Sequence, residues 1–212
     1  MKLSPLSIMK YFSLFVFSLF ASGLLAQDTI VLLSGEIIPV KSFTINEKEN
    51  IISFVNKRGK DKFIELDFIF SVRQSNGEEL VVYKDSVFED DSITVNEMRE
   101  FVTGSITASE TYHAPLATIS GFVVGAGAVY LFPMAGIPIF WSPVVPAGYS
   151  AIIGSLTPKE KCILRNCPEA SGRPYFQNGY SQVCQQKRVT NVVKGSLAGM
   201  AAMIIVAIIV NK

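Results

Sequence analysis

The residues with the most scope for chemistry in this 212-residue chain are its three cysteines and its single histidine. Cys162, Cys167 and Cys184 share one segment, but their spacing is not the paired short spacing of a zinc site. A metal held by all three would need a fourth ligand, and His113 is the only histidine. We therefore expect no bound metal. If this segment lies outside the cytoplasm, we expect one disulfide and one leftover thiol. If it lies inside, we expect three free thiols.

Other catalytic signatures are missing from the sequence. One histidine leaves little scope for a catalytic triad, and the chain contains no G-x-x-x-x-G-K, H-E-x-x-H or G-x-S-x-G motif. The run GFVVGAG from Gly121 looks like a dinucleotide-binding loop, but it follows a helical pattern rather than a strand. Carboxylates such as Glu65, Asp67, Glu78 and Glu79 are typical of a solvated face. We expect neither an enzymatic activity nor a cofactor.

The composition points to a membrane protein instead. Charged residues make up 17% of the chain, against about 25% in an ordinary soluble domain. The apolar residues collect at the N-terminus, in residues 121–154 and at the C-terminus. The net charge is only +1, so no global field favours nucleic acid as a partner.

Residues 1–27 have the pattern of a secretory signal peptide. Two lysines precede an apolar run at 11–20, and small residues precede Gln27. The alternative is an uncleaved anchor, and either interpretation exports the segment that follows. No cysteine lies near the cleavage point, which excludes a lipid-modified cysteine there. We expect the chain in the cytoplasmic (inner) membrane, with its N-terminal domain on the periplasmic side.

Residues 28–86 predict a small β-domain within an α+β membrane protein. About six short β-rich runs fall within about 60 residues, and Asn76-Gly77 is the strongest hairpin signal. This spacing suggests an antiparallel barrel or roll of the SH3-like or Sm-like kind. The segment has no cysteine, so apolar burial must stabilise it. The predicted core residues are Ile30, Leu32, Ile38, Ile52, Phe54, Ile64, Phe68, Phe70 and Val82.

Residues 92–113 predict an amphipathic helix. Thr94 and Glu97 match a capping box, and an apolar stripe follows at helical spacing. The stripe consists of Val95, Met98, Phe101, Val102 and Ile106. It could pack on the β-domain, or lie on the membrane surface or on a second copy. The acidic run 89–91 before it is expected to be a solvated loop, since the spacing of a calcium-binding loop is absent.

Two to three transmembrane helices are expected after this helix. Residues 189–211 are apolar for about the 20 residues that a crossing needs. Residues 115–155 are harder to interpret, because four prolines between 133 and 146 interrupt a continuous helix. This membrane segment is either one crossing plus a re-entrant piece or a helical hairpin.

The loop that follows, 156–188, bears on this choice. It is rich in lysine and arginine, and basic loops tend to stay in the cytoplasm. An exported β-domain then requires an odd number of crossings before the loop, and on this ground we favour the cytoplasmic position. The apolar length of 115–155 favours the hairpin, which leaves the loop outside.

Small residues recur every four positions in both membrane segments, as Ala117, Gly121 and Gly125 and as Gly195 and Gly199. This interval lets two helix backbones approach closely, although glycine is also simply common in membrane helices. Aromatic and basic residues are expected at the membrane interface, with a partner site or anionic-lipid contact as the alternative for those after 174. These residues are Trp141, Tyr149, Tyr175, Tyr180, Lys187 and Arg188.

Several short motifs resemble those of uncharacterised exported bacterial membrane proteins. They include DTIVLLSGEIIPVKSF, NGEELVVYK, EMREFVTGSITASETY and NGYSQVCQQKR, and their order extends over most of the chain. The resemblance implies this order of parts and assigns no activity and no functional residue.

The expected function is a membrane-anchored interaction or binding module of the bacterial cell envelope. Its expected partners are membrane lipid and either a protein or a second copy of the chain. The alternative is a subunit of a transport or channel complex. Residues 116–156 contain no ionisable side chain of the kind that ion paths use, which counts against this alternative. A polar, water-filled cavity at 134–154 would favour it.

Overall fold

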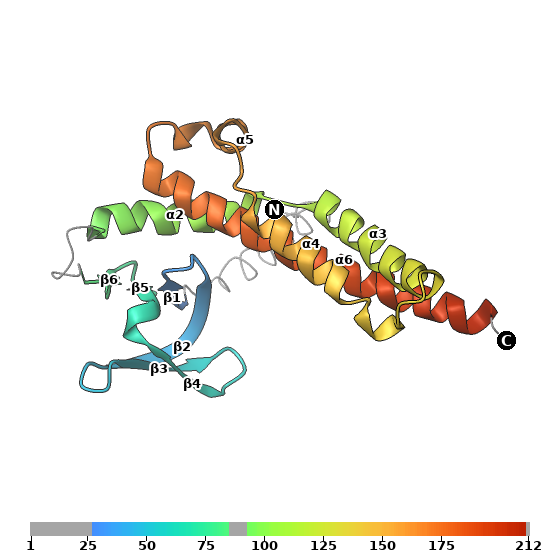
Figure 1. The fold of residues 1–212 in the computed structure, drawn as a ribbon. Helices are drawn as coiled ribbons and strands as arrows, with labels where there is room; N and C mark the ends of the chain where they lie inside the picture. The colour runs from blue at the N-terminus through green and yellow to red at the C-terminus, as the bar shows by residue number, and fades with distance from the viewer. Residues whose placement is uncertain (1–26, 85–92, 211–212) are drawn as a thin grey trace, which may run out of the picture. The chain divides into compact units, whose positions relative to one another are not determined.

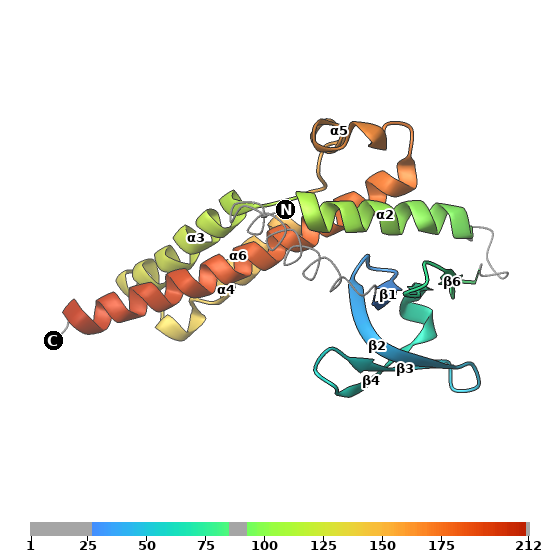
Figure 2. The same ribbon diagram turned by 180° about the vertical axis from the view of Figure 1, so that it is seen from behind.

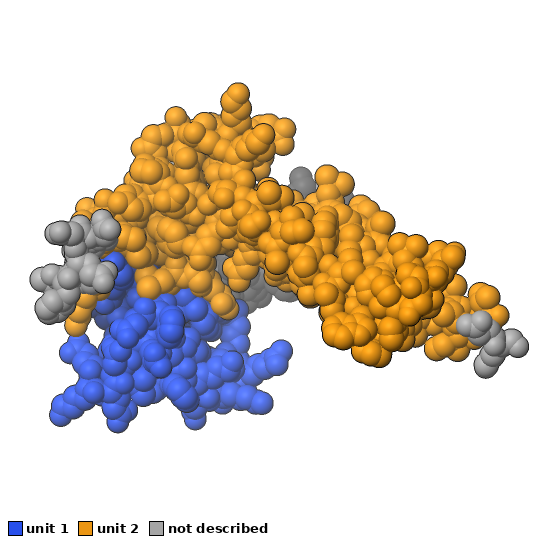
Figure 3. All heavy atoms as spheres, in the orientation of Figure 1, with its two compact units in different colours: residues 1–32, 37–83 blue, residues 33–36, 84–212 orange. Residues whose placement is uncertain are grey.

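The computed structural model describes residues 27–84 and 93–210. The chain forms two compact units, coloured separately in Figure 3. The first unit holds the described residues up to Leu32 together with Ile37–Tyr83, and the second holds Leu33–Glu36 and the described residues after Tyr83. The predicted signal peptide, apart from Gln27, and the acidic run 89–91 lie outside the described residues.

The first unit is a six-stranded antiparallel sheet (Figure 1). Its strands are β1 (Asp28–Leu32), β2 (Ile37–Asn46), β3 (Ile51–Asn56), β4 (Asp61–Glu65), β5 (Ile69–Arg73) and β6 (Glu79–Val81). They lie in the order β4-β3-β2-β1-β5-β6. Together with the helices that follow, this sheet confirms an α+β fold. The SH3-like identity stays a prediction.

The hairpin predicted at Asn76-Gly77 joins β5 to β6. The Gly77 backbone has a φ of +89°, which a residue with a side chain rarely adopts. Its N–H donates to the Gln74 carbonyl at 3.0 Å, and the Asn76 side-chain oxygen accepts from the Glu78 N–H at 2.9 Å. Gly77 thus supplies the positive φ that this turn requires, and Asn76 supplies a side-chain acceptor for its backbone.

Alternation along the strands places one set of apolar side chains in a common core. Its buried members are Ile30, Val40, Ile52, Phe54, Ile69 and Val72, with Leu32, Ile38, Ile64 and Val82 packed against them. One predicted core residue is wrong, since Phe68 is 59% exposed. It ends a short 3-10 helix, η1 (Leu66–Phe68), so β5 begins one residue later than expected. All four residues from Ile69 to Val72 are buried, and Ile69 and Val72 both join the core across an irregularity in the pairing of β1 with β5.

The second unit is helical. It consists of α2 (Val95–Thr111), α3 (Pro115–Met134), η2 (Ile139–Trp141), α4 (Val144–Ser155), α5 (Glu160–Asn166), η3 (Pro168–Ala170) and α6 (Pro174–Val210). Figures 1 and 2 show α2 and then α3 running alongside the 37-residue α6. Among the described residues, α3 and α6 are long and apolar enough to cross a membrane, and a bent helix pair, 139–155 with 160–166, could make a third span.

The helix α2 begins at the predicted capping box. The Glu97 N–H donates to Thr94 Oγ1 at 3.4 Å, and the Thr94 N–H donates to the Glu97 carboxylate at 2.8 Å. This backbone hydrogen bond, helped by the Thr94 hydroxyl, lowers the pKa of Glu97. The buried side of α2 contains Val102, Ser105 and Ala108, and the helix packs along α6. The sequence interpretation did not consider α6 as its partner.

The chain reverses direction after α3. Gly136, with a φ of +72°, follows the last turn of α3, and α4 then packs back against both α3 and α6. The end of α4 returns to where α3 begins. Arg188 of α6 donates to the Leu156 carbonyl at 3.4 Å, and Asn191, one turn later, donates to the Ala114 carbonyl at 3.2 Å. This arrangement has the form of a helical hairpin, and the number of membrane crossings stays a prediction.

Candidate functional site: helix interfaces and a cationic pocket

Glycines let α3 and α6 touch backbone to backbone. A Cβ placed on Gly121 would overlap the Val192 carbonyl oxygen, and one on Gly125 would overlap that of Ser196. From the other helix, Gly195 and Gly199 lie in the same way against the Thr118 and Phe122 carbonyls. Contact positions rise together along both helices, so the helices run parallel. Ala117, the other predicted packing residue, is half-buried in the first turn of α3.

The same type of contact joins α2 to the first half of α6. A Cβ on Gly104 would overlap the Phe176 carbonyl oxygen, and one on Gly179 would overlap that of Phe101. Sequence reasoning missed both glycines, although Gly104 and Ala108 have the four-residue spacing that it noted elsewhere. The small-residue interface therefore extends beyond the apolar segments and along most of α6.

A lysine closes the end of α2. The Lys187 ammonium donates to the carbonyl oxygens of Ala108 at 3.2 Å and Tyr112 at 2.9 Å, and also to that of Ser109. The Ala108 carbonyl also accepts the Tyr112 N–H at 3.0 Å, whereas the last carbonyls of a helix generally lack a helical partner, at the end where the helix dipole is negative. The lysine thus satisfies and neutralises this helix end.

The neighbouring side chains of α6 complete the junction between α2 and α3. Arg188 Nε donates to the Tyr112 hydroxyl at 2.7 Å, and its guanidinium lies 5.7 Å from the centre of that ring. Asn191 holds the Ala114 carbonyl. Lys187 and Arg188 are both engaged in contacts between helices, and their position at the membrane interface stays a prediction.

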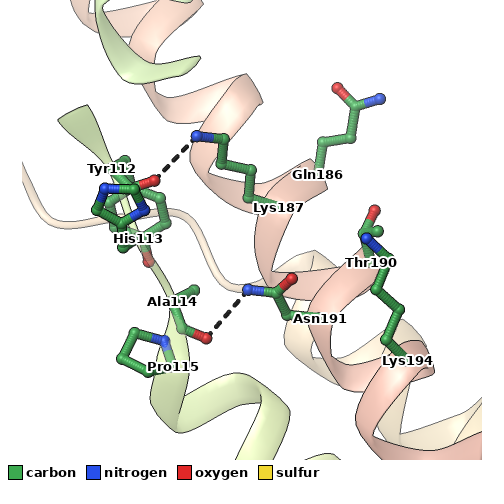
Figure 4. Close-up of a pocket in the computed structure, with 9 residues that line it drawn as sticks. All are labelled: Tyr112, His113, Ala114, Pro115, Gln186, Lys187, Thr190, Asn191 and Lys194. Carbon is green, nitrogen blue, oxygen red and sulfur yellow. Dashed lines mark hydrogen bonds between the residues drawn. The ribbon is translucent and has the colours of Figure 1, made fainter. Parts of the chain in front are cut away.

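A pocket of about 580 Å³ opens beside this junction (Figure 4). It is lined by Tyr112, His113, Ala114, Pro115, Gln186, Lys187, Thr190, Asn191 and Lys194. Two lysines and a histidine line it without any acidic side chain. Lys194 is exposed and points back along α6 toward Thr190. We call this site the cationic pocket.

Tyr180 does not lie at a surface. It is 1% exposed, and its hydroxyl lies 3.4 Å from Thr111 Oγ1 and 3.5 Å from the Asn166 side-chain nitrogen. Its ring belongs to a core shared by α2, α5 and α6, so the interface position predicted for it is wrong. Tyr175 hydrogen-bonds Glu97 of α2. In the hairpin, Trp141 is exposed and Tyr149 is half-buried.

The three cysteines differ sharply in access. Cys162 is exposed, whereas Cys167 and Cys184 are buried in the core around Tyr180, and all three are free thiols. Burial raises the pKa of Cys184 to about 11, although the positive charges of Arg188 and Lys187 act in the opposite direction. No cluster of three or more metal-ligating side chains occurs among the described residues.

A second cavity, of about 180 Å³, lies between α4 and α6. It is lined by Pro143, Pro146, Ala147, Ser150, Val193, Ser196, Leu197 and Met200. The Ser150 hydroxyl donates to the Pro146 carbonyl, and the buried Ser196 hydroxyl has no partner in the described part of the chain. Most of this lining is apolar, so the cavity lacks the character of a water-filled path.

Comparison with protein-family models, with curated proteins and with solved structures finds no match for this chain. Function is therefore inferred from the residues and their arrangement.

Proposed function

We propose that this protein is a membrane-anchored interaction module of the bacterial cell envelope, without catalytic activity. The observation that carries the proposal is the apolar outer surface of α3, α4 and α6. Leu116 is 79% exposed and Leu197 is 58% exposed, although the inner faces of their helices are tightly packed. Water would disfavour such a surface, whereas lipid solvates it.

Three crossings account for the hairpin geometry if the returning segment 139–155, which contains η2 and α4, crosses between α3 and α6, since the 12 residues of α4 alone are too short to cross. The loop after α4 then lies on the exported, periplasmic side of the inner membrane. The basic residues of this loop favour a position in the cytoplasm, but several of them bind side chains or carbonyl oxygens of the helical unit. Arg173 pairs with Glu100 at 3.2 Å, and Lys187 and Arg188 bind the end of α2. This engagement weakens the argument from charge.

The β-unit is the proposed binding part. Phe63 on β4 is 74% exposed and stands beside Ser53 and Thr44 in the register of the sheet. Phe68, just beyond β4, is also exposed. The strand β4 ends the described sheet, so its outer backbone edge is open to an added strand. An exposed aromatic on an open edge favours a protein partner, either another envelope protein or a second copy.

Site-specific photo-crosslinking in intact cells tests this role. A photoreactive residue at position 63 is expected to give a discrete higher-mass adduct, whereas one at Lys57, in an exposed turn, is not. Identical patterns from the two positions would count against a partner at β4. Alkaline carbonate extraction tests anchoring separately, because the full chain is expected to stay with the membrane pellet.

The alternative, a subunit of a transport or channel complex, gains no specific support. The cavity between α4 and α6 is mainly apolar, and residues 116–156 contain no ionisable side chain of the kind that ion paths use. We therefore propose the interaction module alone.

A further inference from the structure

We infer that the cationic pocket binds the phosphate headgroup of an anionic phospholipid. The inference rests on the proposed membrane anchoring and adds a specific lipid ligand to it. All lining residues come from one unit, namely the α2–α3 junction and one face of α6.

The charges of the pocket define the class of ligand. Its lining contains Lys187, Lys194 and His113 and no carboxylate. Lys187 is already engaged by three carbonyl oxygens, so its charge is shared with the end of α2. Lys194 has no hydrogen-bond or ion-pair partner within the described residues, and its ammonium is free to bind an anion. A phosphodiester supplies the complementary charge together with strong acceptor oxygens.

The position of the pocket places such a ligand at headgroup depth. Lys194 is the last charged residue before the uncharged stretch 195–210, and Pro115 begins α3 at the start of the uncharged stretch 114–158. The Lys194 side chain points toward Thr190, away from the apolar half of α6 (Figure 4). Lysines near the ends of membrane helices extend in this way to reach the polar interface. The Thr190 hydroxyl and the Gln186 amide add neutral donors to the same lining.

Apolar side chains beyond the pocket favour a lipid over free phosphate. Leu116 and Ile119 of α3 are exposed within about a turn of Pro115, and Val193 and Leu197 of α6 are exposed on either side of Lys194. An acyl chain can cover these side chains while its headgroup contacts the lysine. A zwitterionic headgroup brings its own cation close to Lys194 and should bind less tightly.

Thermal unfolding of the full chain in a neutral detergent tests the inference. The probes are short-chain phosphatidylglycerol, short-chain phosphatidylcholine and inorganic phosphate. We expect phosphatidylglycerol alone to raise the midpoint temperature in a saturable way. Lys194→Gln should weaken this apparent affinity roughly tenfold, the effect of losing one charge-assisted contact. Lys194→Arg should largely restore it, and Lys161→Gln, an exposed lysine of α5 outside the pocket, should match the parent chain.

Each other outcome overturns a defined part of the inference. Equal binding of phosphatidylcholine would overturn the role of net charge, and equal binding of inorganic phosphate would reassign the site to a free anion. Unchanged binding by Lys194→Gln would remove the pocket as the site. If that variant fails to fold, Thr190→Val, at an exposed position, is expected to weaken binding severalfold, and no change would refute the pocket. If the parent chain does not bind phosphatidylglycerol but still resists carbonate extraction, this inference is refuted and the proposed function still stands.

Discussion

The backbone contact between α3 and α6 makes a sharp prediction for Gly125→Ala. The substitution adds one carbon atom where the Ser196 carbonyl oxygen already occupies the space. Gly127, two residues later on the same helix, has no atom within 4 Å of its added Cβ and provides a matched control. Alanine improves helix propensity equally at both positions, by up to about 1 kcal/mol in water. The difference between the two variants therefore isolates the clash.

Forcing extra volume into a packed interface typically destabilises a protein by about 1–3 kcal/mol. We expect Gly125→Ala to lower the free energy of unfolding by about this amount relative to Gly127→Ala. The measurement is SDS-induced unfolding of the full chain in mild detergent, followed by helical circular dichroism. Equal stability of the two variants, within about 0.5 kcal/mol, would refute the close approach at Gly125.

Three further predictions concern other parts of the chain. Lys187→Met removes the charge that binds three carbonyl oxygens at the end of α2, and the same unfolding measurement should show a loss of about 1.5–3 kcal/mol. A loss below about 0.5 kcal/mol would contradict the cap. In intact cells, a membrane-impermeant maleimide should label only the exposed Cys162. Cys184 is buried, and its raised pKa of about 11 keeps it a protonated, unreactive thiol at pH 7–8. Labelling of Cys162 only after permeabilisation would refute the hairpin topology. A fragment of residues 27–84, which contains the whole β-unit, should unfold cooperatively on heating; an unfolded fragment would show that the sheet depends on the rest of the chain.

Local features of this protein were predictable from short-range rules. The capping box at Thr94 and Glu97 and the hairpin at Asn76-Gly77 depend on residues only a few positions apart, so the chain itself determines them. The six strands were visible because alternation and turn residues act over the same short range. Phe68 was misplaced because it belongs to a single turn of 3-10 helix and not to the strand that follows.

The pairing of helices that are distant in the sequence could not be predicted in the same way. A small-residue spacing identifies a face that can approach another helix, but it does not say which helix, so α6 was missed as the partner of α2. Likewise Lys187 and Tyr180 have types that suit a membrane interface. Only the packing of α2 onto α6 shows that the lysine closes a helix and that the tyrosine is buried.

The continuity of α6 has a mechanical consequence. At 1.5 Å per residue its 37 residues extend about 55 Å, almost twice the hydrocarbon thickness of a bilayer. Its first half packs against α2 at Gly104 and Gly179, and its second half packs against α3 at Gly195 and Gly199. Since no break separates these halves, a tilt or rotation of the lipid-embedded part turns the part outside with it. With the proposed membrane anchoring, α6 would therefore act as a lever between the bilayer and α2, the first helix after the β-unit in sequence.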